Sequence, residues 1–505
     1  MSLLGVDVGT TGCKTSVFSP EGQILGSAYR EYDVRSPQPG WAELDAVAVW
    51  QAVKETMAQV ATCAKADPVT ALAVSSMGEA MVPVGADRRI LGPSLLLQDV
   101  RGEAYLPALH RALPDDRLYA ANGNTLGNHY SLTKLMWIRD HRSDEYRATR
   151  KYLLWGSFVS YMLGAEPLVD YSLANRTLLF DLHREDWSPE LCEIAGLDPL
   201  KLPGVCPSGT VIGAVAPAVA AELGLPAGAA IVAGAHDQCA NAVGCGVVDA
   251  GLAVYGMGTI LCITPVFTDP PDASLMIPRG LNTEHHAAPG RYVSFIYNQG
   301  GALVKWFRNT FAGEEHRAAQ AAGVDVYPQL FAEMPEEPSS VTVLPLFSAS
   351  GPPSFIADAA GVVTGLRLET TRGAILKGIV EGTTFYLREC VEALPGAGIT
   401  IDEYRAVGGG SKSDAWIQLS ADILGRPFVR PQVTEAGALG AAIIAGVGAG
   451  VFNSHEDGVA AMVRPDRTFD PDPRRGRAYD EQYAHYRELW PRLESYLRGW
   501  RTPTA

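Results

Sequence analysis

The stretch LLGVDVGTTGCKTSVF, residues 3–18, predicts how this 505-residue chain begins to fold. Its first six residues form a short, mostly apolar run that predicts a β-strand, and residues 15–18 predict a second strand. A turn rich in glycine and threonine, residues 9–12, joins them. We therefore expect a β-hairpin whose exposed backbone amides can bind phosphate oxygens.

The side chains of this hairpin suit a phosphate ligand. Gly9 lets the backbone approach a ligand closely, Thr10 and Thr11 supply hydroxyl donors, and Lys14 supplies a positive charge. Asp7 stands where a carboxylate can hold Mg²⁺, directly or through water. A plain hairpin with a glycine-rich turn is the alternative, and the motif alone leaves both open. It is not a Walker A loop, because a strand rather than a helix follows Lys14.

The same pattern recurs in the second half of the chain. Residues 253–255 and 260–264 predict strands, and the turn between them ends in Gly258 and Thr259. A phosphate chain held between two such hairpins accounts for the repetition. Because strands alternate with helices along the chain, we expect α/β domains. We place their boundary near residue 248, which gives domains 1–248 and 249–505, the second with a terminal helical tail.

Asp237 follows a buried strand predicted over residues 229–233 and begins a helix. Aspartate is a favoured N-cap, and a carboxylate suits the positive end of a helix. The alternative is a general base that takes a proton from a substrate hydroxyl. The residues alone favour the cap. They favour a packed or hydrogen-bonding role for His236.

Three glycines at 408–410 end another predicted strand, and a helix closed by Gly425 follows. Bare glycine backbone before a helix N-terminus can support a flat ring or a phosphate. A dinucleotide site is a poor match, because GxGxxG is absent. Residues 284–286, Glu-His-His, predict a loop or surface segment, since adjacent side chains rarely converge on one metal ion.

Composition narrows the class of protein. A chain of 505 residues exceeds one core, and 47% apolar with 19% charged residues is typical of an ordinary packed globule. The net charge of −15 disfavours nucleic acid and anionic membranes as main partners. Residues 436–452 are uncharged but shorter than a membrane span, so they predict a buried helix. Eight scattered cysteines without a CxxC pair, and no signal peptide, predict a reduced cytoplasmic protein.

Taken together, the motifs resemble the FGGY carbohydrate kinases, the family of glycerol kinase and xylulokinase. The resemblance extends from Leu4 to about Gly450. Its most specific pieces occur in the family's order: DVGTTGCKTSVFSPEGQIL near the start, HDQCANAVGCG in the middle, and AVGGGSKSDAWIQLSADILGRPFVRPQVTEAGALGAAIIAGVGAG near the end.

This resemblance implies two actin-like ATPase (ribonuclease H-like) domains with a ligand cleft between them. It implies ATP with Mg²⁺ as the phosphoryl donor and a sugar bound by the N-terminal half. Asp237 matches the family's catalytic base, in place of the cap reading, and together with Asp7 it is the expected metal ligand. The residues expected to bind the nucleotide are Gly9, Thr10, Thr11, Lys14, Gly258, Thr259, Gly301, Gly409, Gly410 and Asp414.

The resemblance also implies a set of substrate contacts, with departures from both named relatives. Gly78 replaces the arginine that precedes the acid Glu79 in glycerol kinase, and Leu97 replaces a tryptophan two residues before Asp99. The expected substrate-binding residues are Glu79, Asp99, Arg101, His129, Asp237 and Gln238.

We expect ATP-dependent phosphorylation of a small sugar or polyol, with a pentulose such as xylulose as the leading class. Glycerol, erythritol and gluconate are the alternatives among kinases. An actin-like regulatory ATPase and a noncatalytic sugar sensor are the alternatives outside them. The resemblance to the family also implies a homodimer.

Overall fold

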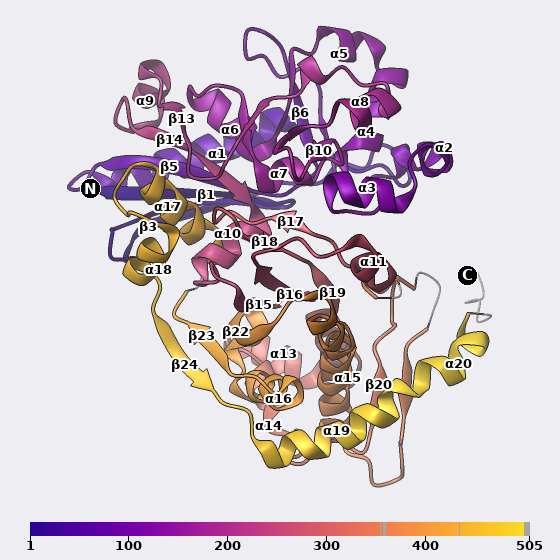
Figure 1. The fold of residues 1–505 in the computed structure, drawn as a ribbon. Coiled ribbons are helices and arrows are strands. Elements are labelled where there is room, and N and C mark those ends of the chain that lie inside the picture. The colour runs from indigo at the N-terminus through magenta and orange to yellow at the C-terminus, as the bar shows by residue number, and fades with distance from the viewer. Residues whose placement is uncertain (354, 357–359, 434, 499–505) are drawn as a thin grey trace.

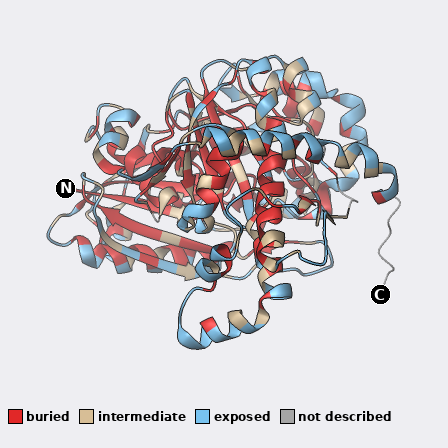
Figure 2. Cartoon of the chain, turned by 90° about the horizontal axis from the view of Figure 1, so that it is seen from below, coloured by how far each residue is buried: buried red, intermediate tan, exposed pale blue. Residues whose placement is uncertain are grey.

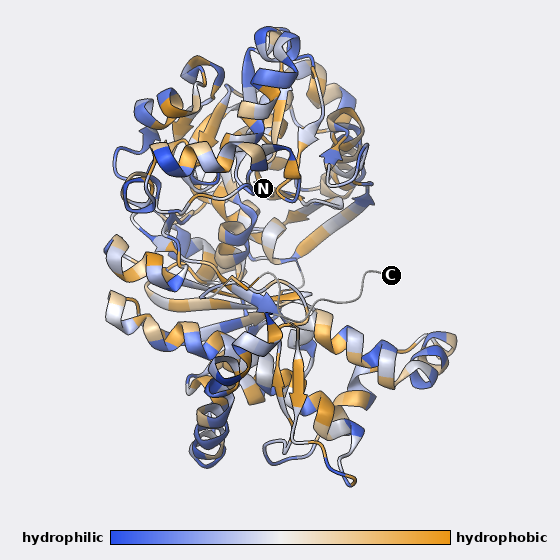
Figure 3. Cartoon of the chain, turned by 90° about the vertical axis from the view of Figure 1, so that its right-hand side faces the viewer, coloured by the Kyte–Doolittle hydropathy of each residue, from blue (hydrophilic) through white to orange (hydrophobic). Residues whose placement is uncertain are grey.

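The structure is a computed structural model, and it describes residues 1–353, 355–356, 360–433 and 435–498. Each half of the chain builds one large mixed β-sheet with helices around it, and Figure 1 shows the first half above the second. Apolar side chains follow the strands and the inner helix faces, as the orange segments in Figure 3 show. The two-sheet α/β architecture expected from the sequence is confirmed.

The first sheet has six strands in the order β13-β14-β5-β1-β2-β3. Neighbours β14, β5 and β1 run parallel, whereas β1 with β2, β2 with β3 and β13 with β14 are antiparallel. The hairpin predicted at the N-terminus is therefore confirmed. The strands are β1 (Ser2–Val8), β2 (Gly12–Phe18), β3 (Ile24–Glu31), β5 (Val69–Ser76), β13 (Val211–Ala214) and β14 (Ala230–His236).

The second sheet repeats this topology. Its order is β17-β18-β16-β15-β22-β23-β24, and β19 also pairs with β16. The hairpin β15–β16 is antiparallel, β15 and β22 run parallel, as do β22 and β23, and β24 closes the edge antiparallel. The strands are β15 (Gly251–Met257), β16 (Ile260–Phe267), β17 (Glu284–His285), β18 (Tyr292–Val293), β19 (Ile296–Gln299), β22 (Ile401–Val407), β23 (Phe428–Pro431) and β24 (Pro465–Phe469).

Short strand pairs and helices complete the two halves. The pairs are β4 (Glu43–Leu44) with β7 (Ser94–Leu95), β6 (Met81–Val84) with β8 (Lys151–Leu154), β9 (Leu168–Asp170) with β12 (Gly204–Cys206), β10 (Phe180–Asp181) with β11 (Asp186–Trp187), and β20 (Thr342–Leu344) with β21 (Val362–Thr364). The first-half helices are α1 (Ala46–Ala61), α2 (Leu106–Ala112), α3 (Asp115–Asn122), α4 (Ser131–His141), α5 (Ser143–Ala148), α6 (Trp155–Leu163), α7 (Tyr171–Asn175), α8 (Pro189–Ala195), α9 (Pro217–Leu223) and α10 (Asp237–Gly244). The second-half helices are α11 (Ala273–Met276), α12 (Gly301–Phe311), α13 (Gly313–Ala322), α14 (Tyr327–Ala332), α15 (Arg372–Ala393), α16 (Asp414–Leu424), α17 (Ala436–Gly448), α18 (His455–Met462), α19 (Pro473–Arg487) and α20 (Leu489–Leu497).

Local sequence explains where the helices beside the sheets begin and end. The carboxylate of Asp45 accepts hydrogen bonds from the first backbone amides of α1, and the hydroxyl of Ser413 does so for α16. Gly425 ends α16 at φ 64°, a left-handed conformation that glycine adopts without steric cost. The helix expected after the glycine triplet is therefore confirmed.

Helix α17 belongs to the second half in sequence but packs against the first sheet. It contacts β1, β5, β14 and helix α10, and Figure 1 shows it beside the indigo strands. The contact is close because glycines meet backbone: a Cβ on Gly440 would lie 1.8 Å from the Ala240 carbonyl oxygen, and one on Gly5 would lie 1.8 Å from that of Ala438. The buried helix predicted within residues 436–452 is confirmed. The division near residue 248 stays a prediction. Helix α17 follows that division in sequence but packs against the sheet that precedes it.

The end of the described chain is helical, as expected. Helices α19 and α20 extend along the lower edge of the second half and are exposed on their outer side (Figure 2). Tyr479, Tyr483 and Tyr486 are buried on the inner face of α19, with ring centroids 5.5–6.3 Å from that of Phe385. Within the described residues, every helix is too short or too polar to cross a membrane.

We predict that Gly440→Ala destabilises the protein. The new methyl group must displace backbone in the α17–α10 contact, and overpacking of this kind costs about 1–3 kcal/mol. The measurement is the midpoint of thermal unfolding followed by circular dichroism.

The matched control is Gly476→Ala in helix α19, where the added Cβ meets only one atom, at 3.4 Å. Its midpoint should stay the same or rise, because alanine is the better helix former. Equal midpoints for the two variants would show that the close approach of α17 is not under steric pressure.

Candidate active site

The carboxyl ends of the parallel strands of the first sheet gather the candidate residues at one edge. In the strand registers, Asp7 on β1 pairs with Ser75 on β5, and Ser76 on β5 pairs with His236 on β14. Asp237 follows His236 directly as the first residue of α10. In open α/β sheets, ligands bind at such carboxyl ends.

Asp7 is a partly buried carboxylate held by its neighbours. The Ser75 hydroxyl donates a hydrogen bond of 2.7 Å to its Oδ1. Burial raises the pKa of Asp7, and the nearby Glu435 adds to the rise. Glu435, which precedes α17, forms a 2.6 Å ion pair with Lys14 on β2. The N-terminal residues of α17 thus meet the first hairpin beside Asp7.

The carboxylate of Asp237 is 30% exposed and turned toward other acids. Burial raises the pKa of Asp237 to about 7, and the charges of Asp7 and Glu79 contribute to the rise. His236 Nε2 lies 3.1 Å from Asp237 Oδ1. Burial holds the pKa of His236 well below 6.5, so the contact joins a neutral ring to the carboxylate. His236 occupies the N-cap position of α10, and its ring is buried edge-on to that of Phe295, so the packed role expected for it is confirmed.

Arg176 joins two acids from different halves of the chain. Its Nε donates to Glu79 Oε1 at 2.8 Å, and its Nη1 donates to Glu284 Oε1 at 2.6 Å. All three side chains are at least 88% buried. Glu79 adopts φ 56°, unusual for a residue with a side chain, and a Cβ on Gly78 would lie 2.9 Å from Arg176 Cγ. The arginine therefore fills the space that a larger residue at position 78 would need.

Sequence reasoning missed Arg176 and misplaced residues 284–286. Those three residues were expected in a loop or at the surface, and this is wrong: Glu284, His285 and His286 are all buried, and the first two form strand β17. The physical reason is Arg176, which neutralises the buried Glu284 from a helix end 108 positions away in sequence. No local pattern around either residue signals that pairing.

The other predicted substrate residues have different surroundings. Asp99 and Arg101 bind each other through several hydrogen bonds, Arg101 also bonds Glu43 at 2.6 Å, and its guanidinium stacks 4.0 Å from the Trp41 ring. Both side chains are almost fully buried in this internal cluster. His129 is exposed and stacks on Tyr130, with ring centroids 3.9 Å apart. Gln238 is half-buried beside Asp237. A substrate contact by any of them stays a prediction.

The second sheet presents glycine and threonine at the corresponding strand ends. Gly258 and Thr259 form an exposed two-residue turn between β15 and β16. The amide of Gly301 donates to the Gly258 carbonyl at 3.0 Å and that of Ala302 to the Thr259 carbonyl at 2.9 Å, so the turn is fixed to the start of α12. A Cβ on Gly301 would lie 2.4 Å from the Gly258 oxygen, which explains the glycine there.

The glycine triplet follows β22, which runs parallel to β15. Gly256 pairs with Val407, so the triplet lies at the same sheet edge as the second hairpin turn. Gly408 and Gly409 are exposed. Asp414 begins α16 and forms ion pairs with Arg430, at 2.7 Å, and with Arg467. The predicted nucleotide residues of the second half thus share one edge, apart from Asp414, which is engaged by two arginines.

The carboxylates of Asp7 and Asp237 fit a Mg²⁺ ion. Mg²⁺ is usually held by one or two carboxylates together with waters and substrate phosphates. The negative charge of Asp7 raises the pKa of Asp237, and a bound cation would offset this repulsion. In the described part of the chain, no group of three or more acidic, histidine or cysteine side chains forms a metal cage. The ligand set expected here is therefore small and shared with the nucleotide.

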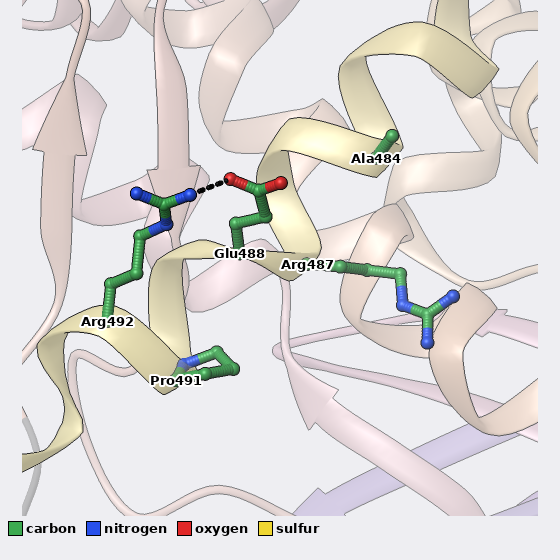
Figure 4. A pocket seen from close by; sticks show the side chains of 5 residues that line it. All are labelled: Ala484, Arg487, Glu488, Pro491 and Arg492. Atoms are coloured by element: carbon green, nitrogen blue, oxygen red, sulfur yellow. Dashed lines mark hydrogen bonds and ion pairs between the residues drawn. The ribbon is translucent and has the colours of Figure 1, made fainter.

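A separate surface hollow lies on α19 and α20, far from these edges in Figure 1. Figure 4 shows the residues that line its volume of about 520 Å³, and among them Glu488 and Arg492 form a 2.6 Å ion pair one helical turn apart. It contains none of the predicted site residues. The hollow is lined by Ala484, Arg487, Glu488, Pro491 and Arg492.

The two sheets have the same topology, and each has a glycine–threonine hairpin at the edge that carries the candidate residues. One of these edges also has paired acids. Together these features define a two-domain phosphotransferase of the actin-like ATPase fold. The chain belongs to the FGGY family of carbohydrate kinases. The model of the family's N-terminal domain matches residues 2–244, and that of the C-terminal domain matches residues 258–449.

Three relatives illustrate the similarity. An autoinducer-2 kinase of Escherichia coli (strain SMS-3-5 / SECEC) is 31% identical over 97% of this chain and 93% of its own length. A glycerol kinase of Ralstonia nicotianae is 31% identical over 93% of this chain and 94% of its own length. The crystal structure of xylulose kinase from Rhodospirillum rubrum superposes with a TM-score of 0.89 at 27% identity, covering 98% of this chain and all of that one.

These findings confirm the family, the fold class and the activity class expected from the sequence. The protein is a carbohydrate kinase, a phosphotransferase with an alcohol group as acceptor, and ATP is its expected donor. The relatives differ in the acceptor that their names state. The individual site residues, the metal and the homodimer stay predictions.

We predict that Thr259→Val weakens ATP binding more than acceptor binding. Thr259 is exposed at the turn of the second hairpin, where its hydroxyl can donate to a phosphate oxygen, and valine keeps the shape without that donor. The loss should be about 0.5–1.5 kcal/mol of nucleotide binding, measured by titration calorimetry with each ligand. Thr268→Val, at the exposed far end of β16, is the control and should leave both affinities unchanged. Equal losses for ATP and acceptor in Thr259→Val would contradict the assignment.

Proposed function

We propose that the protein transfers the γ-phosphoryl group of ATP to a hydroxyl of a small neutral carbohydrate, with a pentulose such as xylulose as the first candidate. Asp237 acts as the general base in this proposal. The single observation behind it is the position of the Asp237 carboxylate, which is 30% exposed at the sheet edge, lies 3.1 Å from His236 Nε2 and has a pKa raised to about 7.

A carboxylate with these properties suits the step. It is about half ionised at pH 7 and more so above it, and its raised pKa lets it accept a proton more readily than an ordinary aspartate. His236 Nε2 lies 3.1 Å from Oδ1, and the exposed part of the carboxylate is open to the acceptor hydroxyl in this proposal. Phosphoryl transfer otherwise needs positioning and charge neutralisation, so the base need not be strong.

Charge neutralisation comes from both halves in this proposal. Asp7 and Asp237 would hold Mg²⁺ together with phosphate oxygens, and the ion would supply positive charge to the phosphates. Thr10, Thr11 and the backbone of Gly9 would donate to phosphate from the first hairpin, with Lys14 behind them. Gly258 and Thr259 would do so from the second hairpin. The adenine would lie on the glycine shelf at residues 408–410.

The charges at the first sheet edge favour a neutral acceptor. Glu79, Asp237 and Asp7 surround the region where the acceptor hydroxyl would lie, and they act on one another electrostatically. Arg176, the guanidinium in this cluster, is already bound to Glu79 and Glu284. A carboxylate on the substrate would add a further negative charge beside these acids, which costs binding energy. This disfavours aldonates such as gluconate and favours pentuloses and polyols.

We predict that ATP turnover depends on a neutral carbohydrate. The measurement is ADP release with and without each of D-xylulose, L-xylulose, D-ribulose, erythritol, glycerol and gluconate. A neutral member should stimulate turnover at least about tenfold, and gluconate should not. Stimulation by gluconate alone would contradict the charge argument. Turnover that no acceptor changes would favour a regulatory ATPase, and binding of a sugar without turnover would favour a sensor.

We predict that Asp237→Asn abolishes acceptor-dependent ADP release while ATP still binds. Loss of a general base typically costs 10²–10⁴-fold in rate, and asparagine keeps the size of the side chain. Rates are measured with the best acceptor of the panel, and nucleotide affinity by calorimetry. The control is Asp249→Asn, a half-exposed aspartate paired with Arg291, which should keep full turnover. Full turnover in Asp237→Asn would refute the assignment of the base.

A further inference from the structure

The second half presents an aromatic face to the acceptor residues of the first half. Strand β19 pairs with β16 so that Tyr297 lies directly opposite Cys262, and opposed residues of an antiparallel pair project to the same face of the sheet. Phe295, two residues earlier, has its ring centroid 5.6 Å from that of His236. The Arg176 guanidinium lies 5.8 Å from the same Phe295 ring. This face of the second sheet therefore meets the residue before Asp237 and the arginine that holds Glu79.

Cys262 and Tyr297 occupy successive positions away from Asp237 on that face. Burial raises the pKa of the Cys262 thiol, and the charge of Asp237 adds to the rise. Tyr297 is one strand further, and opposed residues in an antiparallel pair are about 4.5–5.5 Å apart. Burial raises the pKa of the Tyr297 phenol, and Arg176 lowers it through its charge, so the ring lies in the same cluster.

Packing holds the Tyr297 side chain in place and leaves its hydroxyl open to a ligand. A Cβ on Gly351 would lie 2.8 Å from its ring carbon Cδ2, so the backbone of that loop packs against the ring. The Gly351 carbonyl in turn accepts a 2.9 Å hydrogen bond from the Tyr386 hydroxyl. The Tyr297 residue is 36% exposed, and among the described residues its hydroxyl has no hydrogen-bond partner. A fixed ring with a free hydroxyl is suited to contact a carbohydrate, with apolar packing from the ring and a hydrogen bond from its tip.

We propose that Tyr297 is a specificity-determining residue that contacts the end of the acceptor remote from the reacting hydroxyl. The inference rests on the proposed function, because it takes the acceptor to be a neutral carbohydrate whose reacting hydroxyl lies at Asp237. In this proposal a three-carbon acceptor bound at that carboxylate stops short of the phenol and a five-carbon acceptor meets it, so that Tyr297 selects for chain length.

The test compares Tyr297→Phe with wild type on acceptors of two lengths. The substitution removes only the hydroxyl, and one hydrogen bond is worth about 0.5–1.5 kcal/mol, or a 2- to 12-fold change. We expect KM for a five-carbon acceptor such as xylulose to rise about 3- to 10-fold. KM for glycerol and for ATP should change less than twofold. Tyr297→Leu, which also removes the flat ring, should raise KM for the five-carbon acceptor further.

Tyr327→Phe is the matched control. Tyr327 is a half-buried tyrosine in helix α14 whose hydroxyl accepts a hydrogen bond from Arg308, and it lies outside the acceptor face. Its loss should leave every KM unchanged.

Other outcomes separate this inference from the proposed function. Equal KM increases for both acceptor lengths, or no increase for either, would overturn the role of Tyr297 while leaving the kinase assignment intact. A wild type that phosphorylates only three-carbon acceptors would also overturn it. A wild type that phosphorylates no neutral acceptor would refute the proposed function, and the inference with it.

Discussion

The close backbone contact of α17 with α10 and β1 is the constraint on which the rest of the structure depends. Gly440 and Gly5 each leave no room for a Cβ, so the helix approaches both elements as closely as backbone permits. The contact places a helix from residue 436 onward against a sheet that ends at residue 236. It also brings Glu435 to Lys14 and Gly437 to Asp7, where a Cβ would lie 2.8 Å from the carboxylate. The active edge of the first sheet is thus completed by the second half of the chain.

The charge distribution at that edge explains which partners the site can take. Asp7 and Glu79 both raise the pKa of Asp237, and Arg176 makes its ion pairs with Glu79 and Glu284. Burying acids without an ion-pair partner is costly, so Asp7 and Asp237 are expected to recruit a cation. A metal-bound triphosphate supplies one, and a neutral alcohol adds no further negative charge. The same excess of acid that favours these partners works against an anionic acceptor.

Sequence reasoning succeeded where the signal is local and failed where the partners are distant. The two hairpins, the helix closed by Gly425 and the buried helix within residues 436–452 each follow from a short pattern, and each is confirmed. The ion pair of Arg176 with Glu284 joins residues 108 positions apart, so no window of sequence contains it. Tyr297 was missed for the same reason, because only the register of β19 against β16 turns it toward the acceptor residues. Family resemblance supplied the meaning of Asp237, which the residues alone assigned to a cap.

The two halves have the same strand topology but different chemistry at their active edges, and the ion pairs that join them differ in kind. Both edges present a glycine–threonine turn that suits phosphate, and the first edge also presents the acids that suit a cation and an alcohol. The Arg176 cluster joins the halves from a buried position, where removing one partner leaves an uncompensated charge and is strongly destabilising. The pair of Lys14 with Glu435 is more than a quarter exposed on both sides, and such pairs contribute at most about 1 kcal/mol. The junction between the halves is therefore strong at the Arg176 cluster, beside the acceptor residues. It is weaker at Lys14, beside the expected phosphate site, where a ligand can rearrange the ion pair at low cost.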